Sequence, residues 1–363
     1  MSSGNRASHP GSFGFPTRAS LHIAGEARPL RVAVLGAGSI GCFVGGCWQA
    51  AGLPVTFIGR PSFASDIGGY GLTLSDYSGW EASISPVNVD YRCGPEGLAG
   101  ADIIALCVKS GATADAAKQI AQHGREGSIV LSLQNGISNV DVLEHELGSR
   151  FRVVRGMVPY NVAYLGEGRF HKGVAGEIYS EDAAEMRELA KGIGPSPGAL
   201  KLSSDMLSLA WGKLLINLNN AVSALSGRTL LEELRERDYR RVFAASMSEG
   251  LRLLEKARIK PAKVGAVGPR LLPWVIGAPD WLFNNVFLKK WKIDAKARSS
   301  MSDDLASGRR TEIDYINGEL VRLADRLGAS APVNRKIVQL IRKAESGAPP
   351  LPPAQLRREI LGR

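Results

Sequence analysis

The chain has 363 residues, of which 44% are hydrophobic and 22% are charged, a balance typical of a soluble globular protein. This length is large for one compact core and suits two domains with an additional terminal segment. The formal net charge of +10 would attract an anionic cofactor or substrate. The basic residues stand in small groups without interleaved aromatic residues, which argues against nucleic-acid binding.

Residues 1–29 differ in composition from the rest of the chain. They are rich in Ser, Gly, Pro and Ala and lack the apolar run of a secretory signal. We expect this segment to be disordered. Its arginines and its few acidic residues are also typical of organelle transit sequences, but a loose extension or a start codon assigned too early is the favoured interpretation.

A glycine-rich turn follows the first predicted strand. Strands are predicted over 31–36 and 55–58, with a helix from the turn to about residue 51, so that strand, turn, helix and strand fit within about 30 residues. In such a unit the first glycine permits the turn, the second lets a pyrophosphate approach, and the third allows close helix–strand packing. Amides at the helix N-terminus face the phosphates. We expect a dinucleotide to be bound by Gly36, Ala37, Gly38, Ser39, Ile40 and Gly41.

The end of the second strand indicates which dinucleotide is bound. Units that bind NAD usually place Asp or Glu there to hold the ribose 2′-hydroxyl. This chain has Gly59 and Arg60 instead, and no carboxylate before Asp66. A guanidinium can bind a 2′-phosphate through two hydrogen bonds, whereas a carboxylate would repel it. The sequence therefore favours NADP(H) over NAD(H), with an ordinary surface arginine as the alternative.

Two later strands also end in polar residues. A strand over 102–108 is followed by Lys109, which would lie beside the phosphates or the adenine ribose, or else be a solvated loop lysine. A strand over 128–133 is followed by Gln134 and Asn135, whose amides would contact the nicotinamide or the substrate, or simply form an Asn-Gly turn. The other elements predicted here are short strands over 72–74 and 80–87 outside the main sheet, a helix over 113–122, a strand over 152–158, antiparallel segments near 162–165 and 174–179, and a helix over 181–192.

Long helical patterns replace the strands from about Ser204. The first helix carries Lys213, Asn217 and Asn220 at positions i, i+4 and i+7, which places them on one face. One ammonium and two amides in an otherwise apolar helix must meet water, a partner or a ligand, and a solvated polar face is the alternative. An ammonium shielded from water stabilises the charge that hydride addition leaves on a carbonyl oxygen and then delivers a proton. Partial burial would lower the pKa of Lys213 towards neutrality.

Taken together, these stretches resemble the ketopantoate reductases (2-dehydropantoate 2-reductases). The resemblance covers about residues 31–345 and is carried by VLGAGSIG, Lys109, Gln134-Asn135-Gly136, WGKLLINLNNA and SSMSDDLASGRRTEIDYINGE. It implies an N-terminal Rossmann-type, doubly wound α/β domain that binds NADP, followed by an all-helical C-terminal domain. We place these domains at residues 30–203 and 204–363, with the substrate in the cleft between them.

The resemblance also implies roles for individual residues. Lys213 matches the lysine that contacts the reacting oxygen, and Glu312 matches a glutamate that contacts the cofactor ribose near that lysine. A carboxylate there would favour the charged form of Lys213, and the two groups would titrate as a coupled pair. The expected catalytic residues are thus Lys213 and Glu312. With the polar helix face included, the expected substrate-binding residues are Asn135, Asn217, Asn220 and Ser300. The cofactor-binding residues beyond the glycine turn are Arg60, Lys109, Asn135 and Glu312.

The chain departs from the family pattern in two places. Four residues after Asn217, where some members have a second asparagine, this chain has Ala221. An asparagine expected in the following loop has no match within 228–231. Both differences leave the side chain of the substrate open. An apolar segment over 271–288 is too short and too broken by proline to span a bilayer, and we expect a helix packed over the cleft or a dimer contact, with loose membrane-surface association less favoured.

The sequence therefore predicts NADPH-dependent reduction of 2-dehydropantoate to pantoate, in the pathway to pantothenate and coenzyme A. A reductase of another branched or aromatic 2-keto acid is the alternative. The presence of both Lys213 and Glu312 argues against a third reading, a non-catalytic NADP-binding sensor. Four cysteines without zinc-site spacing predict reduced thiols in a cytoplasmic enzyme that needs no metal. The expected partner is a small 2-keto acid, and a homodimer is left open.

Overall fold

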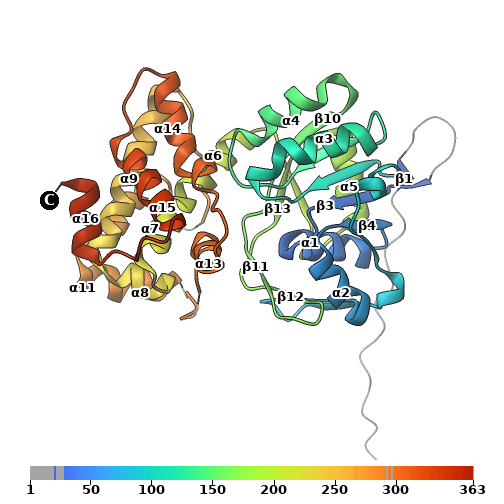
Figure 1. Ribbon diagram of the computed structural model, residues 1–363, viewed down its shortest axis with the longest axis horizontal. Helices are drawn as coiled ribbons and strands as arrows, with labels where there is room; N and C mark the ends of the chain where they lie inside the picture. Colours follow the sequence, from blue (N-terminus) through green and yellow to red (C-terminus); the bar gives the residue numbers. More distant parts are fainter. Residues whose placement is uncertain (1–19, 22–27, 266, 292, 296, 363) are drawn as a thin grey trace, which may run out of the picture.

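The computed structural model describes residues 20–21, 28–265, 267–291, 293–295 and 297–362. Strands and helices alternate as far as Ser203, and every described element after it is helical. The two parts form separate lobes that lie side by side (Figure 1). The predicted fold class, a doubly wound α/β domain followed by an all-helical domain, is confirmed.

Most of the segment 1–29, for which we predict disorder, lies outside the described residues. Within it, β1 (Ser20–Leu21) and β2 (Arg28–Pro29) pair as two short antiparallel strands. These four residues depart from the prediction because their backbone groups pair with one another.

An eight-stranded sheet forms the centre of the N-terminal domain. Its strands are, in spatial order, β14 (Leu200–Ser203), β13 (Ile178–Glu181), β10 (Arg152–Met157), β9 (Ile129–Ser132), β8 (Ile103–Leu106), β3 (Val32–Leu35), β4 (Val55–Ile58) and β7 (Asp90–Arg92). All neighbours are parallel except β10 and β13. Every residue of β3, β8 and β9 is buried, as expected for central parallel strands. The strand order reverses at β3, and ligands of such sheets bind beyond the strand ends at this reversal.

Helices cover both faces of this sheet. They are α1 (Ser39–Ala50), α2 (Pro61–Tyr70), α3 (Thr113–His123), α4 (Asn139–Leu147) and α5 (Ala184–Ile193). On one face Phe43 of α1 and Met186 of α5 belong to one hydrophobic cluster. On the other face Ile120 of α3 and Leu143 of α4 belong to a second cluster. Alternate residues of β3, Val34 and Leu35 among them, point into opposite clusters.

A second sheet stands apart from the main one. The sequence predicts this position for two of its strands, which lie within 72–76 and 81–84. Its order is β11 (Val162–Tyr164), β12 (Arg169–Lys172), β5 (Leu72–Asp76) and β6 (Glu81–Ile84). The prediction of an antiparallel segment near 174–179 is confirmed only for its last two residues, which enter β13 of the main sheet, antiparallel to β10. The antiparallel partner of β11 is β12. β12 contains one buried apolar residue, Phe170, and forms a strand because β11 and β5 pair with it on both sides.

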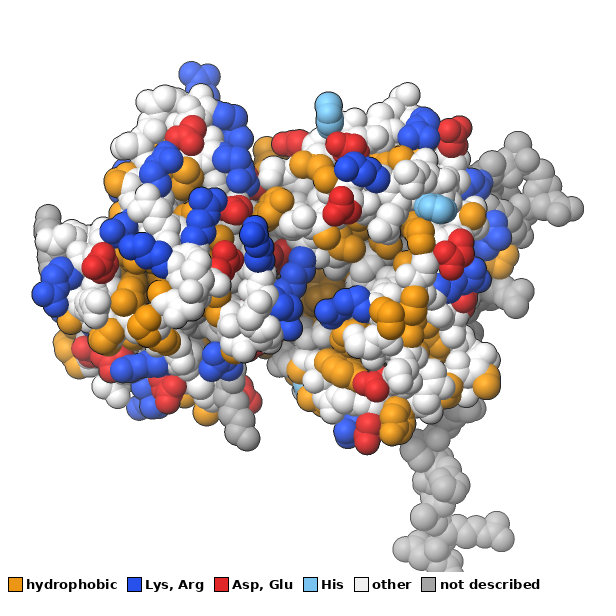
Figure 2. All heavy atoms as spheres, viewed as in Figure 1, with side chains coloured by type: hydrophobic (Ala, Val, Ile, Leu, Met, Phe, Trp, Pro, Cys, Tyr) orange, Lys and Arg blue, Asp and Glu red, His pale blue; other side chains and the backbone are white. Residues whose placement is uncertain are grey.

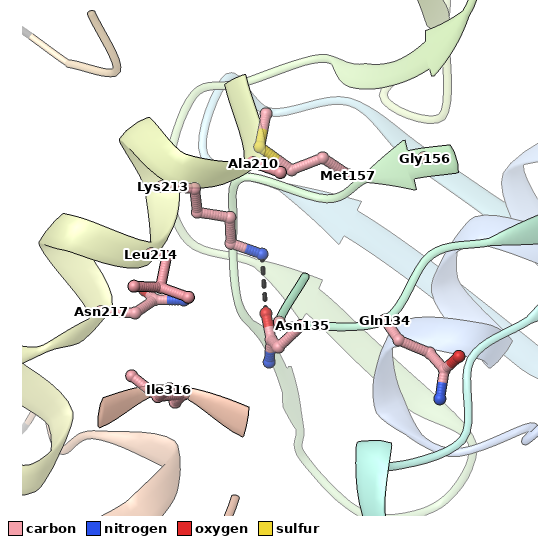
Figure 3. A pocket seen from close by; sticks show the side chains of 10 residues that line it. Gln134, Asn135, Gly156, Met157, Ala210, Lys213, Leu214, Asn217 and Ile316 are labelled. Atoms are coloured by element: carbon pink, nitrogen blue, oxygen red, sulfur yellow. Dashed lines mark hydrogen bonds between the residues drawn. The ribbon is translucent and has the colours of Figure 1, made fainter. Parts of the chain in front are cut away.

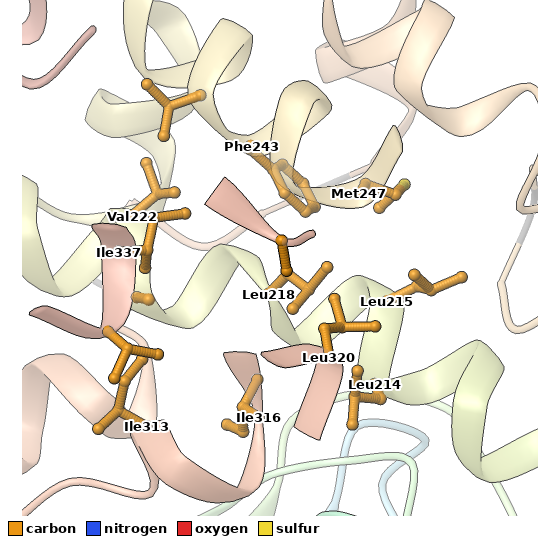
Figure 4. Close-up of a cluster of buried hydrophobic side chains, with 14 of the residues drawn as sticks. Leu214, Leu215, Leu218, Val222, Phe243, Met247, Ile313, Ile316, Leu320 and Ile337 are labelled. Atoms are coloured by element: carbon orange, nitrogen blue, oxygen red, sulfur yellow. The ribbon is translucent and has the colours of Figure 1, made fainter. Parts of the chain in front are cut away.

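The C-terminal domain is a bundle whose core is continuous. Its helices are α6 (Met206–Asn217), α7 (Asn219–Ser226), α8 (Leu230–Arg235), α9 (Arg237–Lys256), α10 (Leu272–Ile276), α11 (Asp280–Leu282), α12 (Leu288–Trp291), α13 (Ser300–Ala306), α14 (Asn317–Arg326), α15 (Pro332–Glu345) and α16 (Pro353–Leu361). Leu215, Phe243, Leu320 and Ile337, from four helices, meet Leu218 of the α6–α7 junction in the core (Figure 4). Leu214 and Leu215, which follow Lys213 on α6, are buried in this core. Their burial fixes the rotation of α6 about its axis and so the direction in which Lys213 extends.

The apolar segment 271–288 does not form the single helix expected over the cleft. It is divided among α10, α11 and a π-helical turn over Phe283–Phe287. The segment packs against residues of α8 and lies away from the N-terminal domain (Figure 1). The buried guanidinium of Arg240 holds it by donating to Ile276 O and Ala278 O, at 2.9 and 2.8 Å. Trp274 and Trp281 are 83% and 69% exposed. Among the described residues, no helix has the length and apolar character needed to cross a bilayer.

Candidate active site

The glycine turn lies between β3 and α1, at the reversal of strand order. Gly36 has a φ of +96°, and a Cβ there would overlap the backbone of Val108. A Cβ on Gly41 would overlap the carbonyl oxygen of Gly36, whereas no heavy atom lies within 4 Å of a Cβ built on Gly38. The turn is thus closely packed at its first and third glycines and open at its second. This arrangement fits a pyrophosphate at the turn.

The residues between the glycines complete this part of the site. Ala37 is buried, and its carbonyl oxygen accepts from the hydroxyl of Tyr91 at 3.2 Å. Ser39 and Ile40 are the first residues of α1. Amides in the first turn of a helix have no intrahelical acceptors, so the N–H groups of Ser39 and Ile40 are suited to bind phosphate oxygens.

The two basic residues predicted to bind the nucleotide are held differently. Arg60 is the N-cap residue of α2 and is exposed, with its guanidinium carbon 5.6 Å from the ring centre of Phe63. Lys109 forms an ion pair with Asp304 of α13, whose carboxylate also accepts from Arg309 Nε at 3.1 Å. The helical domain therefore supplies a counter-charge to Lys109. On the face drawn in Figure 2, Lys and Arg side chains gather where the surface between the two domains is hollowed.

Lys213 extends from α6 to the N-terminal domain. Its Nζ donates to Oδ1 of Asn135 at 2.8 Å (Figure 3). It also donates to the carbonyl oxygen of Val158 at 2.6 Å. Removal of the ammonium from water lowers the pKa of Lys213 to about 8, although the negative charge of Glu312 opposes this change. The lysine is therefore protonated below about pH 8 and close enough to neutrality to give up its proton.

Glu312 reaches Lys213 through Asn135. Its Oε2 accepts from Nδ2 of Asn135 at 3.1 Å, and its Oε1 accepts from the backbone N–H of Ser110 at 2.9 Å. An ionised carboxylate only accepts hydrogen bonds, so it holds the NH₂ end of the Asn135 amide. The oxygen end of that amide is consequently turned towards the ammonium of Lys213. The sequence-based expectation that Glu312 lies near the lysine agrees with this geometry.

A buried polar network supports Asn135 from behind. Nδ2 of Asn139 donates to Oγ of Ser110 at 3.1 Å and also to the carbonyl oxygen of Asn135. Oγ1 of Thr113 donates to Oδ1 of Asn139 at 3.0 Å, and Nε2 of Gln134 donates to Oγ1 of Thr113 at 2.8 Å. The side-chain amide of Gln134 is therefore engaged within its own domain, and it points away from Asn135 in Figure 3.

A small hollow that is open to solvent lies against these groups. It is lined by Gln134, Asn135, Gly136, Gly156, Met157, Ala210, Lys213, Leu214, Asn217 and Ile316. Three of these side chains are polar groups predicted from the sequence to meet the substrate: Asn135, Lys213 and Asn217. Met157 and Ile316 give the hollow an apolar wall. The lining therefore combines polar and apolar side chains.

Two predicted substrate-binding residues lie outside this lining. α6 ends at Asn217 and α7 begins at Asn219, so the helix expected to continue through Asn220 is interrupted at Leu218. The carbonyl oxygen of Asn220 accepts from Oγ of Ser299 at 3.1 Å. Ser300 is the exposed first residue of α13.

A second contact between the domains involves Glu319 of α14. Its side chain is 1% exposed, and Oε1 accepts from the backbone N–H groups of Ser138 at 2.9 Å and Ile137 at 3.3 Å. The side chain of Ile137 packs into the core of the helical domain. The loop that carries Asn135 is therefore fixed by the helical domain at both ends.

Five further residues, which the sequence did not predict, have contacts at or beside the site. Ser110 directly follows Lys109 at a strand end, a position where ligands bind, and this signal was available. Two of the other four, Asp304 and Glu319, stand in the stretch 299–319 that carries the family resemblance, but their contacts with the N-terminal domain join distant parts of the chain. The four residues are Tyr91, Asn139, Asp304 and Glu319.

Comparison with known proteins agrees with this geometry. The family model "Ketopantoate reductase PanE/ApbA" matches residues 32–185, and "Ketopantoate reductase PanE/ApbA C terminal" matches residues 205–345. The 2-dehydropantoate 2-reductase of Archaeoglobus fulgidus is 28% identical over 329 residues, which cover 88% of this chain and 99% of that protein.

Solved structures share the whole two-domain fold. The PanE/ApbA family ketopantoate reductase from Ralstonia eutropha JMP134 has a TM-score of 0.73 and 28% identity, covering 87% of this chain and 99% of that one. A D-mandelate dehydrogenase with NADH and anilino(oxo)acetate has a TM-score of 0.71 at 19% identity, with coverage of 87% and 99%, which shows a common fold. With family models matched over residues 32–185 and 205–345, this chain belongs to the ketopantoate reductase family and is an oxidoreductase that takes a nicotinamide cofactor.

Proposed function

We propose that this enzyme reduces 2-dehydropantoate to pantoate with NADPH. The observation that carries the proposal is the ammonium of Lys213, held by an amide of the other domain at the edge of a hollow with polar and apolar walls. A cytoplasmic location, and a place in the pathway to pantothenate and coenzyme A, remain predictions. So does a homodimer, for which the exposed Trp274 and Trp281 offer a candidate surface.

The hydrogen bonds of Lys213 suggest how it acts. An ammonium has three N–H groups, and the contacts with Asn135 and Val158 use two of them. The third can donate to the keto oxygen of a substrate in the hollow. Bound NADPH supplies the hydride. As negative charge develops on the keto oxygen, Lys213 stabilises it and then transfers its proton, which completes the alcohol.

Glu312 and Asn135 keep Lys213 ready for this role. The carboxylate orients the amide of Asn135, and the amide oxygen in turn fixes the ammonium. The negative charge of Glu312 also keeps the pKa of Lys213 from falling further. Burial lowers the pKa of Lys213 and the charge of Glu312 raises it, so the two effects together hold this pKa near the working pH, where a lysine is an effective proton donor.

The lining of the hollow supports a branched 2-keto acid. The carbon next to the keto group of 2-dehydropantoate carries two methyl groups and a hydroxymethyl group. Met157, Leu214 and Ile316 offer the apolar surface that the methyl groups need, and Asn217 offers an amide to a hydroxyl or carboxylate oxygen.

One observation favours a second candidate, a 2-keto acid whose side chain is wholly hydrocarbon. Ala221 is 0% exposed and belongs to the helical core, so it offers no polar group to a substrate hydroxyl. Thr229 in the next loop is committed to capping α8 through the backbone N–H of Glu232. Neither of the two places where the chain departs from its family therefore supplies an amide to the substrate.

A substrate panel tests the proposal. Purified enzyme would be given NADPH and either 2-dehydropantoate, its analogue without the hydroxyl, or an aromatic 2-keto acid, and NADPH oxidation followed by absorbance. The highest kcat/KM with 2-dehydropantoate supports the proposal. The highest value with the analogue or the aromatic acid supports the second candidate, and no oxidation with any of them contradicts both.

Cofactor choice is tested separately by Arg60→Asp. A carboxylate would repel the 2′-phosphate of NADPH, whereas NADH has no such group. We expect NADPH to bind much more weakly while NADH changes little. Equal effects on both nucleotides would show that Arg60 does not contact the phosphate.

A further inference from the structure

Tyr91 joins the two segments that would hold the nucleotide. It lies on β7, the edge strand of the main sheet, in register with Phe57 of β4. Its hydroxyl lies 3.2 Å from the carbonyl oxygen of Ala37 in the glycine turn and 3.2 Å from that of Arg60. The single phenolic proton can donate to either oxygen, so one side chain ties the glycine turn to the start of α2. Burial raises the pKa of Tyr91, which keeps the hydroxyl protonated.

The same hydroxyl occupies the space above Gly59. A Cβ built on Gly59 would overlap the Tyr91 oxygen and would lie 3.0 Å from the carbonyl oxygen and 3.1 Å from the Cβ of Ala37. Gly59 directly follows β4, and NAD-binding units usually place their ribose-binding carboxylate at this strand end. While Tyr91 stands there, no side chain can begin at position 59 without displacing it.

Arg60 also depends on this arrangement. Its guanidinium has no hydrogen-bond or ion-pair partner among the residues that the structure describes, and its one recorded side-chain contact is with the ring of Phe63. Its carbonyl oxygen accepts from Phe63 N–H at 3.1 Å as well as from Tyr91. The backbone of Arg60 is therefore fixed from two sides while its charged group is free to meet a ligand.

We propose that Tyr91 determines the preference for NADP(H) over NAD(H), by excluding a carboxylate from position 59 and by holding the backbone from which Arg60 reaches the 2′-phosphate. The inference rests on the proposed use of NADPH. Tyr91 thus acts on cofactor specificity by positioning the backbone of Arg60, without a role in the reaction itself. Its loss should change nucleotide affinity and leave the reducing step intact.

Direct titration of the enzyme with NADPH and NADH, followed by nicotinamide fluorescence, tests this without any substrate. Tyr91→Phe keeps the ring and removes the hydrogen bonds, and we expect NADPH affinity to fall about 2- to 10-fold, the loss of one hydrogen bond, while NADH affinity stays nearly constant. With saturating NADPH, kcat should stay that of the unmodified enzyme. The matched control is Tyr77→Phe, because Tyr77 is 54% exposed and lies beyond β5 in the second sheet.

Two further variants test whether Tyr91 excludes a carboxylate side chain from position 59. Gly59→Asp alone should weaken both nucleotides, because the new side chain meets Tyr91. Gly59→Asp combined with Tyr91→Ala should bind NADH more tightly than NADPH. An NADPH preference unchanged in Tyr91→Phe, or a preference for NADH already in Gly59→Asp alone, would overturn the inference and leave the proposed function standing. Equal affinities of the unmodified enzyme for both nucleotides would overturn both.

Discussion

Nζ of Lys213 lies 2.8 Å from Oδ1 of Asn135, so a side chain of the helical domain is bound to the strand-end loop of the α/β domain. The two residues are 78 positions apart in the chain. Each domain thus supplies one half of the polar site, and neither half is complete alone. The activity of the enzyme should therefore depend on contacts that hold the domains in register.

Replacement of Lys213 by alanine should reduce kcat by roughly 10²- to 10⁴-fold, the range expected when a general acid is lost. NADPH affinity should persist, because the glycine turn and Arg60 are untouched. Steady-state kinetics and direct titration measure the two quantities. Lys201→Ala is the matched control, since Lys201 is an exposed lysine paired with Glu177 at 3.5 Å. A kcat for Lys213→Ala equal to that of the control would remove this lysine from the mechanism.

The pH dependence of the reaction should follow Lys213. Its pKa of about 8 means that the ammonium needed for reduction is present below pH 8 and is lost as the pH rises above it. The rate of keto acid reduction should therefore fall on the alkaline side, whereas oxidation of the alcohol, which needs the neutral amine, should increase there.

Glu312→Gln tests whether Lys213 is the group that controls this pH dependence. The carboxylate raises the pKa of Lys213, so removal of its charge should move the alkaline limb of the rate profile to lower pH. A limb that stays in place, or moves to higher pH, would show that another group controls it.

Asp304→Asn tests the ion pair across the domains. Asp304 holds the ammonium of Lys109, which the resemblance places beside the nucleotide phosphate. Without this competitor, NADPH should bind about 2- to 5-fold more tightly, because the half-exposed ammonium of Lys109 would be released from a buried carboxylate, and the gain should shrink with added salt. Titrations at two salt concentrations measure this. Weaker binding would mean that Asp304 helps to place Lys109 for the nucleotide.

The fold was largely predictable because its strongest signals are local. The glycine turn, the buried strands on either side of β3 and the helix that carries Lys213 are all readable from short stretches. β7 and β12 were not predicted, since Asp90–Arg92 and Arg169–Lys172 are short and mostly polar and become strands only through their neighbours. Tertiary pairing decides such segments, and a sequence pattern does not contain it.

The part of the site that could be predicted consists of residues whose ammonium or amide groups stand out in an otherwise apolar helix or at a strand end. Lys213, Asn135 and Asn217 line one hollow, and their roles there stay predictions. Asn220 is not among the residues that line the hollow, although the backbone at Leu218, between α6 and α7, stays in the helical region. Ser110 and Asn139 were not predicted as site residues. Their roles depend on hydrogen bonds between the loops that follow β8 and β9, and these bonds form only when the two strands pair.

Glu319 should be a stability residue that also affects catalysis. Its buried carboxylate accepts from the backbone N–H groups of Ile137 and Ser138, and replacement by alanine would leave both donors buried without an acceptor. We expect Glu319→Ala to lower the free energy of unfolding by about 1–3 kcal/mol, and Glu319→Gln, which keeps one acceptor oxygen, to lower it less. Because the same loop carries Asn135, kcat should fall in parallel with stability across the two variants. Glu359→Ala, at an exposed ion pair with Lys336, should leave both quantities nearly unchanged. Chemical denaturation and kinetics on the same preparations measure them. A destabilised Glu319→Ala enzyme with full kcat would show that the loop keeps its catalytic geometry without this contact.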